Sequence, residues 1–319
     1  MGHKETLYRK NKVDDKTKKT KTLKKLNCSP AVKGKTVKSD SCLLPANLEK
    51  IKDAYNKAHS SSPIKSSNSS EIWDQLKSRL SCKSEMCWID QLSDPGLKRQ
   101  IKEFQFAPKK PDDWKGPKEE DKWVSNFDIM AVLHQYEKVY PEFVLIEPTT
   151  MDFDSRPKEK GGECVLPELC NFSLEKWIKK KKTKIAISLN LAYFYQGGEH
   201  WVSLFVDIEN RLIFYFDSGG DPPVEQIQVL IDRILDQGSK LSHPIHFKVV
   251  DNRGNQHQHK DTECGMYSMF FFITMLTGKI TGPNGAEKPV SLRNRMDLFL
   301  KKKIPDSAMI HHRNLYFND

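Results

Sequence analysis

The sequence has no long apolar run, no internal repeat and no segment typical of a secreted protein. Hydrophobic residues make up 37% of the 319. None of the apolar stretches reaches the roughly 18 residues that a membrane-spanning helix needs. No apolar stretch follows Met1, and the cysteines number seven, which is odd. We therefore expect no transmembrane segment, residence in a reducing compartment and no disulfides.

The cysteines also lack the usual zinc spacing. Two pairs lie near each other in the chain, Cys82 with Cys87 and Cys164 with Cys170. Structural zinc sites commonly use two cysteines separated by two residues, which neither pair matches. We expect these four residues to be free, partly buried thiols, and we expect no metal and no cofactor.

Positive charge is concentrated at one end of the chain. The net charge is +10, and residues 1–40 hold 13 Lys and Arg against 4 Asp and Glu, while the remaining 279 hold 39 against 38. A lysine-rich segment without hydrophobic periodicity is typically disordered, so we expect residues 1–40 to form a flexible basic arm. Contact with nucleic acid or another acidic surface is the alternative to a solvated tail.

The rest of the chain divides into two regions. Residues 41–112 have helical spacing over 44–59 and 71–80, separated by a serine-rich linker, with Ser69 or Ser70 as the expected N-cap of the second helix. This indicates a small helical accessory region, and prolines mark its end. Residues 113–319 are denser in apolar residues and are expected to form the main domain.

The main domain mixes helical and strand patterns, which indicates an α+β fold. The apolar segment 266–276 has hydrophobic residues nearly all round, as expected of a buried helix. Expected elements are helices over 126–140, 224–235 and 266–276, and strands over 143–146, 184–195, 201–207, 212–217 and 245–251.

Cys264 directly precedes the buried helix. Unpaired N–H groups and the helix dipole at a helix start favour a thiolate, the reactive form of cysteine. A lone cysteine in this place is more often a packed core residue, so the functional interpretation depends on partners. His200 and Asp217 provide them, because they end two neighbouring strands.

The register of the expected hairpin decides how closely His200 and Asp217 approach. A turn at residues 208 and 209 would place the two residues directly opposite, with Cβ atoms about 4.5–5.5 Å apart. A turn centred on Asn210 would offset the pair, yet leave both at the open end of the hairpin. A carboxylate there would orient an imidazole that takes the thiol proton.

Gln258 lies on the polar loop that leads to Cys264. An amide donor beside the backbone N–H of the cysteine could form an oxyanion hole. Gln256 is an equally placed alternative on spacing alone.

These residues, in the order His200, Asp217, Gln258 and Cys264, resemble the clan of cysteine peptidases that includes the SUMO proteases and the adenovirus protease. The segments Tyr215-Phe216-Asp217-Ser218 and Asp261-Thr262-Glu263-Cys264-Gly265 carry the likeness, and Trp123-Val124-Ser125-Asn126 resembles the motif that opens that catalytic domain. The resemblance implies a papain-like core with a central mixed sheet over residues 113–319. It also implies a Cys-His-Asp triad and substrate contacts by Trp123, Asn126 and Trp201.

Within the clan, the chain resembles the polyprotein-processing proteases of African swine fever virus and related giant DNA viruses. The helical region before the domain and Gln135-Tyr136-Glu137 carry this likeness. It implies cleavage after Gly-Gly in viral structural precursors, and location in the virion and the virus factory of the host cytoplasm. One departure is Asp217, because the third catalytic residue of the African swine fever enzyme is Asn.

Three other functions are alternatives to a viral endopeptidase. Two of them would use the same catalytic residues, and the third would use none of them. An isopeptidase that removes SUMO or another ubiquitin-like modifier, located in the cytoplasm or nucleus, shares the chemistry and the Gly-Gly specificity. An acetyltransferase would use the same triad, and an inactive binding module would need none of it. The presence of Cys264, His200 and Asp217 counts against the last.

Overall fold

The computed structural model describes residues 22–114, 122–282 and 285–319. Over these ranges no helix has both the length and the apolar character to cross a membrane. The elements are η1 (Pro30–Val32), α1 (Pro45–Ala58), α2 (Ser69–Arg79), α3 (Met86–Ile89), α4 (Pro95–Gln105), η2 (Asp112–Trp114), α5 (Asn126–Glu137), β1 (Phe143–Thr150), η4 (Lys158–Lys160), α6 (Pro167–Cys170), α7 (Leu174–Lys179), β2 (Lys184–Asn190), β3 (Trp201–Asp207), β4 (Leu212–Phe216), α8 (Glu225–Ser239), β5 (Lys248–Asp251), α9 (Cys264–Thr277), β6 (Lys279–Thr281), β7 (Glu287–Pro289), α10 (Leu292–Lys301) and α11 (Asp306–Tyr316).

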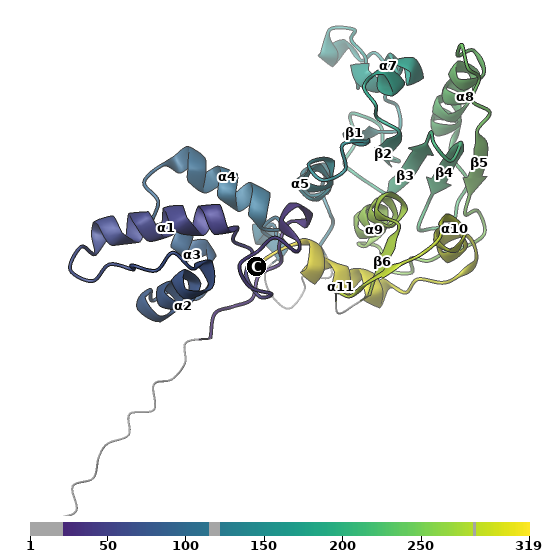
Figure 1. Cartoon of the computed structure of the whole chain (residues 1–319). Helices are drawn as coiled ribbons and strands as arrows, with labels where there is room; N and C mark the ends of the chain where they lie inside the picture. The colour runs from purple at the N-terminus through teal and green to yellow at the C-terminus, as the bar shows by residue number, and fades with distance from the viewer. Residues whose placement is uncertain (1–21, 115–121, 283–284) are drawn as a thin grey trace, which may run out of the picture.

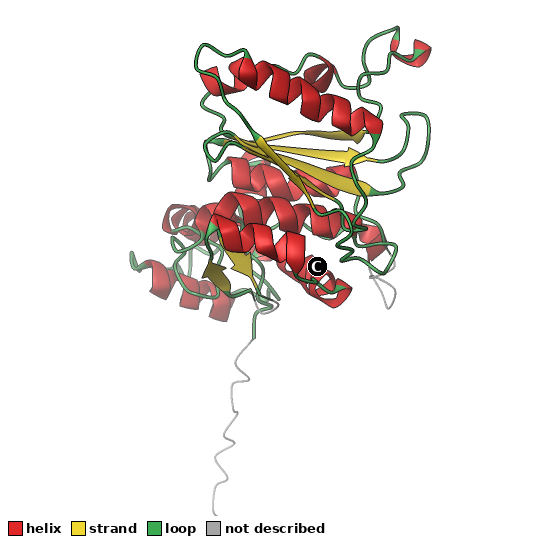
Figure 2. Ribbon diagram, turned by 90° about the vertical axis from the view of Figure 1, so that its right-hand side faces the viewer, coloured by secondary structure: helices red, strands yellow, loops and turns green. Residues whose placement is uncertain are grey.

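A five-stranded mixed sheet with helices on both faces forms the centre of the main domain (Figure 2). The strand order is β1-β2-β3-β4-β5, with parallel pairs at the two edges and antiparallel pairs between them. Every residue of β2, β3 and β4 is buried, because apolar layers cover both faces. The predicted α+β fold with a central mixed sheet is therefore confirmed.

Each face of the sheet has its own apolar layer. On one face, α9 packs against β3, with α5, α10 and α11 around it. On the other face, α7 and α8 cover the sheet. The predicted helix over 266–276 is confirmed, and it begins two residues earlier, so that Cys264 is its first residue.

Several element boundaries differ from the predictions for local reasons. Asn68, not Ser69 or Ser70, caps α2, since its side chain accepts from the N–H groups of residues 70 and 71. Helix α5 ends at Glu137 instead of residue 140, and β1 continues to Thr150 because it pairs with β2 along its length. Strand β2 ends at Asn190, well before residue 195.

The helical region packs around a separate apolar cluster. Helices α1 to α4 lie together and apart from the sheet (Figure 1), and their buried residues run from Leu26 to Phe106. Trp114, by contrast, packs in the core of the main domain. Phe106 and Trp114 thus belong to different apolar clusters, and the boundary before residue 113 stays a prediction.

The expected arm over residues 1–40 falls into two parts. Residues 1–21 lie outside the described residues. The expectation of a flexible arm is wrong for residues 22–40, where Leu26, Ala31 and Val32 are buried. Leu26 packs in the apolar cluster of the helical region and η1 lies against α4 and α5, so the folded chain begins well before residue 41.

Six of the seven cysteines form disulfides, and the expectation of free thiols is wrong for them. The pairs are Cys28–Cys42, Cys82–Cys87 and Cys164–Cys170, with Cα–Cα distances of 5.1, 5.8 and 6.4 Å. These distances lie within the range that a disulfide spans. We expected no disulfides because we expected a reducing compartment. The disulfides are instead possible because folding brings the paired cysteines close together. The reducing compartment stays a prediction.

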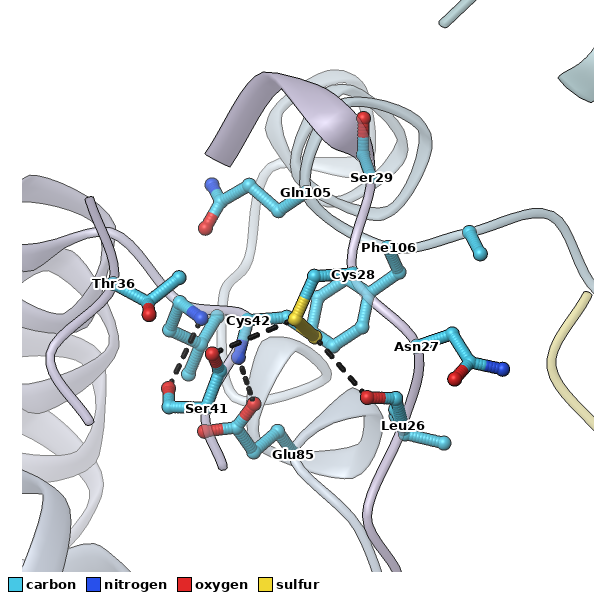
Figure 3. The surroundings of a disulfide bond; sticks show 12 residues. Leu26, Asn27, Cys28, Ser29, Thr36, Ser41, Cys42, Glu85, Gln105 and Phe106 are labelled. Atoms are coloured by element: carbon cyan, nitrogen blue, oxygen red, sulfur yellow. Dashed lines mark hydrogen bonds between the residues drawn. A yellow bond between two sulfur atoms is a disulfide. The ribbon is translucent and has the colours of Figure 1, made fainter. Parts of the chain in front are cut away.

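The Cys28–Cys42 disulfide fastens residues 26–29 to the helical region. Figure 3 shows it beside Glu85, whose carboxylate accepts from the backbone N–H of Cys42 at 2.8 Å. The other carboxylate oxygen of Glu85 accepts from the indole of Trp73. Two elements of the helical region thereby hold the segment that precedes α1.

The C-terminal segment, for which no helix or strand was predicted, joins the two regions. Helix α11 lies between α1–α4 and the sheet domain (Figure 1) and packs against α9. Beyond it, the Asn318 side chain accepts from the backbone N–H of Asn27 at 2.7 Å and donates to Ala107 at 3.1 Å.

Candidate active site

Three predicted catalytic residues lie at the ends of three elements. His200 immediately precedes β3, Asp217 immediately follows β4, and Cys264 begins α9. Strands β3 and β4 are antiparallel, so the first residue of β3 and the last residue of β4 lie at the same end of the two strands. Helix α9 packs across β3, and its first residue, Cys264, lies at this same end of the strands, where it interacts with His200.

His200 and Asp217 form a short hydrogen bond. The distance from His200 Nε2 to Asp217 Oδ1 is 2.6 Å. Of the two registers left open by the sequence, the offset one is found, since Ser203 pairs with Phe216 and Asp207 with Leu212, which leaves residues 208–211 for the turn. The side chains meet diagonally beyond the last paired residues, and the predicted closeness is confirmed.

Asp217 is held from several directions. Its carboxylate is 1% exposed and also accepts from the backbone N–H of Gly219 at 2.7 Å. The Asn252 side chain accepts from the backbone N–H of Asp217 and donates to its carbonyl, at 2.9 and 2.6 Å. The carboxylate therefore has little freedom to turn away from the imidazole.

The imidazole of His200 is held in its charged form. Burial alone would lower its pKa, but the hydrogen bond to Asp217, the interaction with the side chain of Cys264 and the charges of both partners raise the pKa to about 10. Since Nε2 faces the carboxylate, Nδ1 is the nitrogen left for the sulfur. At neutral pH this ring is protonated.

Cys264 is the one free cysteine of the chain and is 3% exposed. It lies in the first turn of α9, where backbone N–H groups have no partners within the helix. The next residue must be Gly265, because a Cβ there would lie 2.6 Å from the Cβ of Val124. The segment that contains Trp123 and Val124 therefore packs directly on the start of α9.

Gln258 and Gln256 differ clearly in their surroundings. Gln258 is buried, and its Oε1 accepts from the hydroxyl of Ser218 at 2.7 Å. Gln256 is exposed, and its amide donates to the backbone carbonyl of Gln258 at 2.9 Å. Of the two, Gln258 is the one fixed beside the strand end that carries Asp217.

Two of the three residues expected to bind substrate line a cavity that includes Gly198 but none of His200, Asp217 and Cys264. The cavity has a volume of about 480 Å³. Trp201 lines it and donates its indole N–H to the carbonyl of Val124 at 2.9 Å. Trp123 lies outside this lining and is 44% exposed. The lining consists of Asn126, Glu147, Pro148, Thr149, Thr150, Lys160, Val165, Leu166, Pro167, Asn190, Phe194, Gly198 and Trp201.

The C-terminal helix contributes contacts that the sequence did not reveal. Arg313 is 1% exposed and donates to Glu263, the residue before Cys264, at 3.1 Å, and to the carbonyl of Lys122 at 2.6 Å. Asp306 accepts from the backbone N–H groups of His259 and Lys260, both at 3.0 Å. Only folding shows these contacts, because the partners are about 50 or more residues apart.

No cluster in the described part of the chain suits a metal ion: three or more His, Cys, Asp or Glu side chains do not converge there. A helix-start cysteine, an imidazole and a buried carboxylate on an α+β sheet define instead the class of cysteine peptidases. Residues 149–310, half of the chain, match the family model described as the Ulp1 protease family, C-terminal catalytic domain. The chain belongs to this family.

Known relatives are viral proteases. The chain is 33% identical over 165 residues to a protein of Acanthamoeba polyphaga mimivirus that is named "Putative thiol protease R355", and the match covers 51% of each. The chain thus spans about half the length of that relative. It is 28% identical over 213 residues to a cysteine protease of African swine fever virus, covering 63% of this chain and 76% of that one.

Among solved structures, an African swine fever virus protease has a similar fold. The TM-score is 0.60 with 23% identity, and the likeness covers 93% of this chain and 97% of the other. The shared architecture therefore extends beyond the sheet domain to the helical region.

Proposed function

We propose that the protein is a cysteine endopeptidase that processes viral structural precursor proteins. In this proposal Cys264 is the nucleophile, His200 the general base and acid, and Asp217 the residue that orients the imidazole. Gln258 and the backbone N–H of Cys264 bind the oxyanion. Family membership supports the reaction type, and the viral relatives support the choice of precursor.

The reaction follows from these roles. The Cys264 thiolate attacks the scissile carbonyl carbon, a C–S bond forms, and the oxygen becomes an oxyanion that N–H donors stabilise. The C–N bond then breaks as the imidazolium of His200 gives its proton to the leaving amine. A water that gives a proton to His200 then attacks the thioester, and the C–S bond breaks, which releases the carboxylic acid product and restores the thiolate beside the imidazolium.

The hydrogen bond between His200 and Asp217 carries the proposal. It occupies Nε2, directs Nδ1 to the sulfur and keeps the ring protonated at neutral pH. A buried histidine of purely structural use would not need a free cysteine at its second nitrogen. Cys264 is also the only cysteine outside a disulfide.

For the substrate we propose an extended segment that ends in Gly-Gly before the scissile bond. The cavity beside Trp201 and Gly198 is large enough for side chains that precede the two glycines. Apolar and neutral polar residues provide most of its lining, with Glu147 and Lys160 as its charged members. We expect neutral side chains to enter it more readily than charged ones.

A second candidate is removal of a ubiquitin-like modifier. Proteins of African swine fever virus that are 28% identical to this chain are named SUMO-1 cysteine proteases. Both reactions cleave after Gly-Gly with the same catalytic residues, so the substrate body alone distinguishes them.

The test compares the two substrate classes with the full chain. One reaction contains a precursor fragment with an internal Gly-Gly-Xaa site, the other a SUMO or ubiquitin fusion, and the Cys264→Ala variant serves as control. We expect rapid cleavage of the precursor after the second glycine and slow cleavage of the fusions. Faster cleavage of the fusions would favour the isopeptidase, and no cleavage of either substrate would refute the proposal.

We also propose virion and virus-factory localisation, and contact of the basic N-terminal segment with nucleic acid or an acidic surface. The charge of residues 1–40 supports the contact. Removal of residues 1–21 should weaken DNA binding in low salt and leave cleavage of a short neutral peptide unchanged. Equal DNA binding by both versions would refute the contact.

A further inference from the structure

Gln258 is fixed by a hydrogen bond at each end of its amide. Its Oε1 accepts from the Ser218 hydroxyl at 2.7 Å, and its Nε2 donates to the backbone carbonyl of Lys260. The side chain is 8% exposed, so water contributes little to these contacts. The position of the amide therefore depends on both protein partners.

The two partners also decide which way the amide faces. A carbonyl oxygen only accepts, so the NH₂ group must face Lys260 and the carbonyl oxygen of Gln258 must face Ser218. An amide nitrogen carries two hydrogens, and the contact with Lys260 uses one. The second is left for an oxyanion.

Ser218 is itself held in one place. It is 1% exposed and directly follows Asp217, whose backbone is bound on both sides by Asn252. Its backbone carbonyl accepts from the N–H groups of His257 and Gln258 at 2.8 and 2.9 Å. Two consecutive residues after β4 thus contact the two parts of the site. Asp217 contacts the imidazole of His200, and Ser218 contacts the amide of Gln258.

We propose that Ser218 is a positioning residue that holds the oxyanion donor Gln258 in register with the catalytic triad. This inference rests on the proposed oxyanion role of Gln258. Ser218 touches neither the substrate nor the reacting atoms; it acts through the amide. Its loss would let the amide shift, which weakens the interaction with the developing oxyanion more than substrate binding.

Other buried serines show that a buried hydroxyl in this protein does not always have a hydrogen-bond partner, as Ser218 does. Ser188 and Ser203 lie in β2 and β3, both are 0% exposed, and their hydroxyls have no hydrogen-bond partner among the described residues. The central sheet thus tolerates a buried serine hydroxyl without a partner. Ser203→Ala is therefore a matched control for Ser218→Ala.

The experiment is a double-mutant cycle in the full chain. Ser218→Ala, Gln258→Ala, the double variant and Ser203→Ala are compared by kcat and KM on a Gly-Gly-Xaa peptide. Alkylation of Cys264 by iodoacetamide, followed by peptide mass spectrometry, reports separately on the cysteine–histidine pair. If Ser218→Ala does not fold, Ser218→Cys, whose S–H is a weaker donor, takes its place.

We expect Ser218→Ala to lower kcat about tenfold, the size of one neutral hydrogen bond, with KM and the alkylation rate unchanged. In the Gln258→Ala background the same change should have no further effect, and Ser203→Ala should match the wild type. Ser218→Cys should fall between the wild type and Ser218→Ala.

Several outcomes would overturn the inference. An unchanged kcat in Ser218→Ala, or a loss that persists in full in the Gln258→Ala background, would show that Ser218 does not act through the amide. An equal fall in alkylation would assign it a general structural role. An unchanged kcat in Gln258→Ala would instead refute the oxyanion role, and the failure would then belong to the proposed function.

Discussion

Strands β3 and β4 have a buried carboxylate paired with a cation at each end of their hairpin. At the active-site end, Asp217 accepts from His200; at the turn end, Asp207 accepts from Lys184 at 2.5 Å. Both carboxylates are 1% exposed.

The partners of the two cations differ. Lys184 also pairs with Glu209 at 2.8 Å, while Asn210 donates twice to Asp207, so these ion pairs and hydrogen bonds join the turn to the neighbouring strand β2. His200 has its second nitrogen directed to Cys264 and is 27% exposed. At the turn end the pair thus joins the hairpin to β2, whereas the pair at the other end lies beside the side chain of Cys264.

The largest expected difference between the two ends comes from the nucleophile. Cys264→Ala should lower kcat on the order of 10⁶-fold, as loss of a catalytic nucleophile does in other triads. The melting temperature should change little, since alanine fills nearly the same space at the start of α9. Peptide cleavage and circular dichroism measure the two effects, and a variant with a hundredth of wild-type activity would show that another group is the nucleophile.

The orienting carboxylate should have the next largest effect. Asp217→Ala should lower kcat about 10⁴-fold, because the imidazole then loses both the partner that orients it and the charge that keeps it protonated. Alkylation of Cys264 at neutral pH should slow as well, since the ring no longer remains protonated. Normal alkylation together with normal kcat would remove Asp217 from the triad.

The turn end should show the opposite behaviour. Asp207→Asn should reduce the free energy of unfolding by about 3 kcal/mol, because it leaves Lys184 without its buried partner. Urea unfolding measures this loss, and kcat per folded molecule should match the wild type. A large fall in kcat with unchanged stability would mean that the two ends are not functionally distinct.

The smallest effect concerns pH. The pKa of His200 is about 10 in the folded chain against 6.5 ordinarily, so its stabilising contribution is fully present below pH 6.5 and is lost as the pH rises through 10. The difference in unfolding free energy between wild type and His200→Ala should therefore decrease over this range, by an amount on the order of 1 kcal/mol. A difference that grows with pH would contradict the raised pKa.

Local patterns predicted much of the sheet domain. The buried helix after Cys264 and the hairpin that brings His200 near Asp217 depend on residues close in sequence, and both were predicted. The sequence left two registers of the hairpin open, and the structure has the offset one, because Asn210 donates to the side chain of Asp207 within the turn over residues 208–211. Periodicity does not contain that information.

Contacts between distant segments could not be predicted in the same way. The disulfide between Cys28 and Cys42 depends on how the helical region folds, and composition suggested free thiols. The contacts of Arg313 and Asp306 with the loop before Cys264 join segments about 50 residues apart. A single sequence gives no sign of such pairs.

The sequence by itself determined the chemistry that this protein carries: a cysteine at a helix start, a histidine and a carboxylate at strand ends, and an amide on the loop between. Each depends on residue type and on neighbours within a few positions, where helix and strand periodicity act. Only the tertiary structure decided how these groups face one another. The nitrogen of His200 that meets Asp217, the Ser218 hydroxyl on Gln258 and the cavity beside Trp201 arise when residues far apart in the chain are packed together.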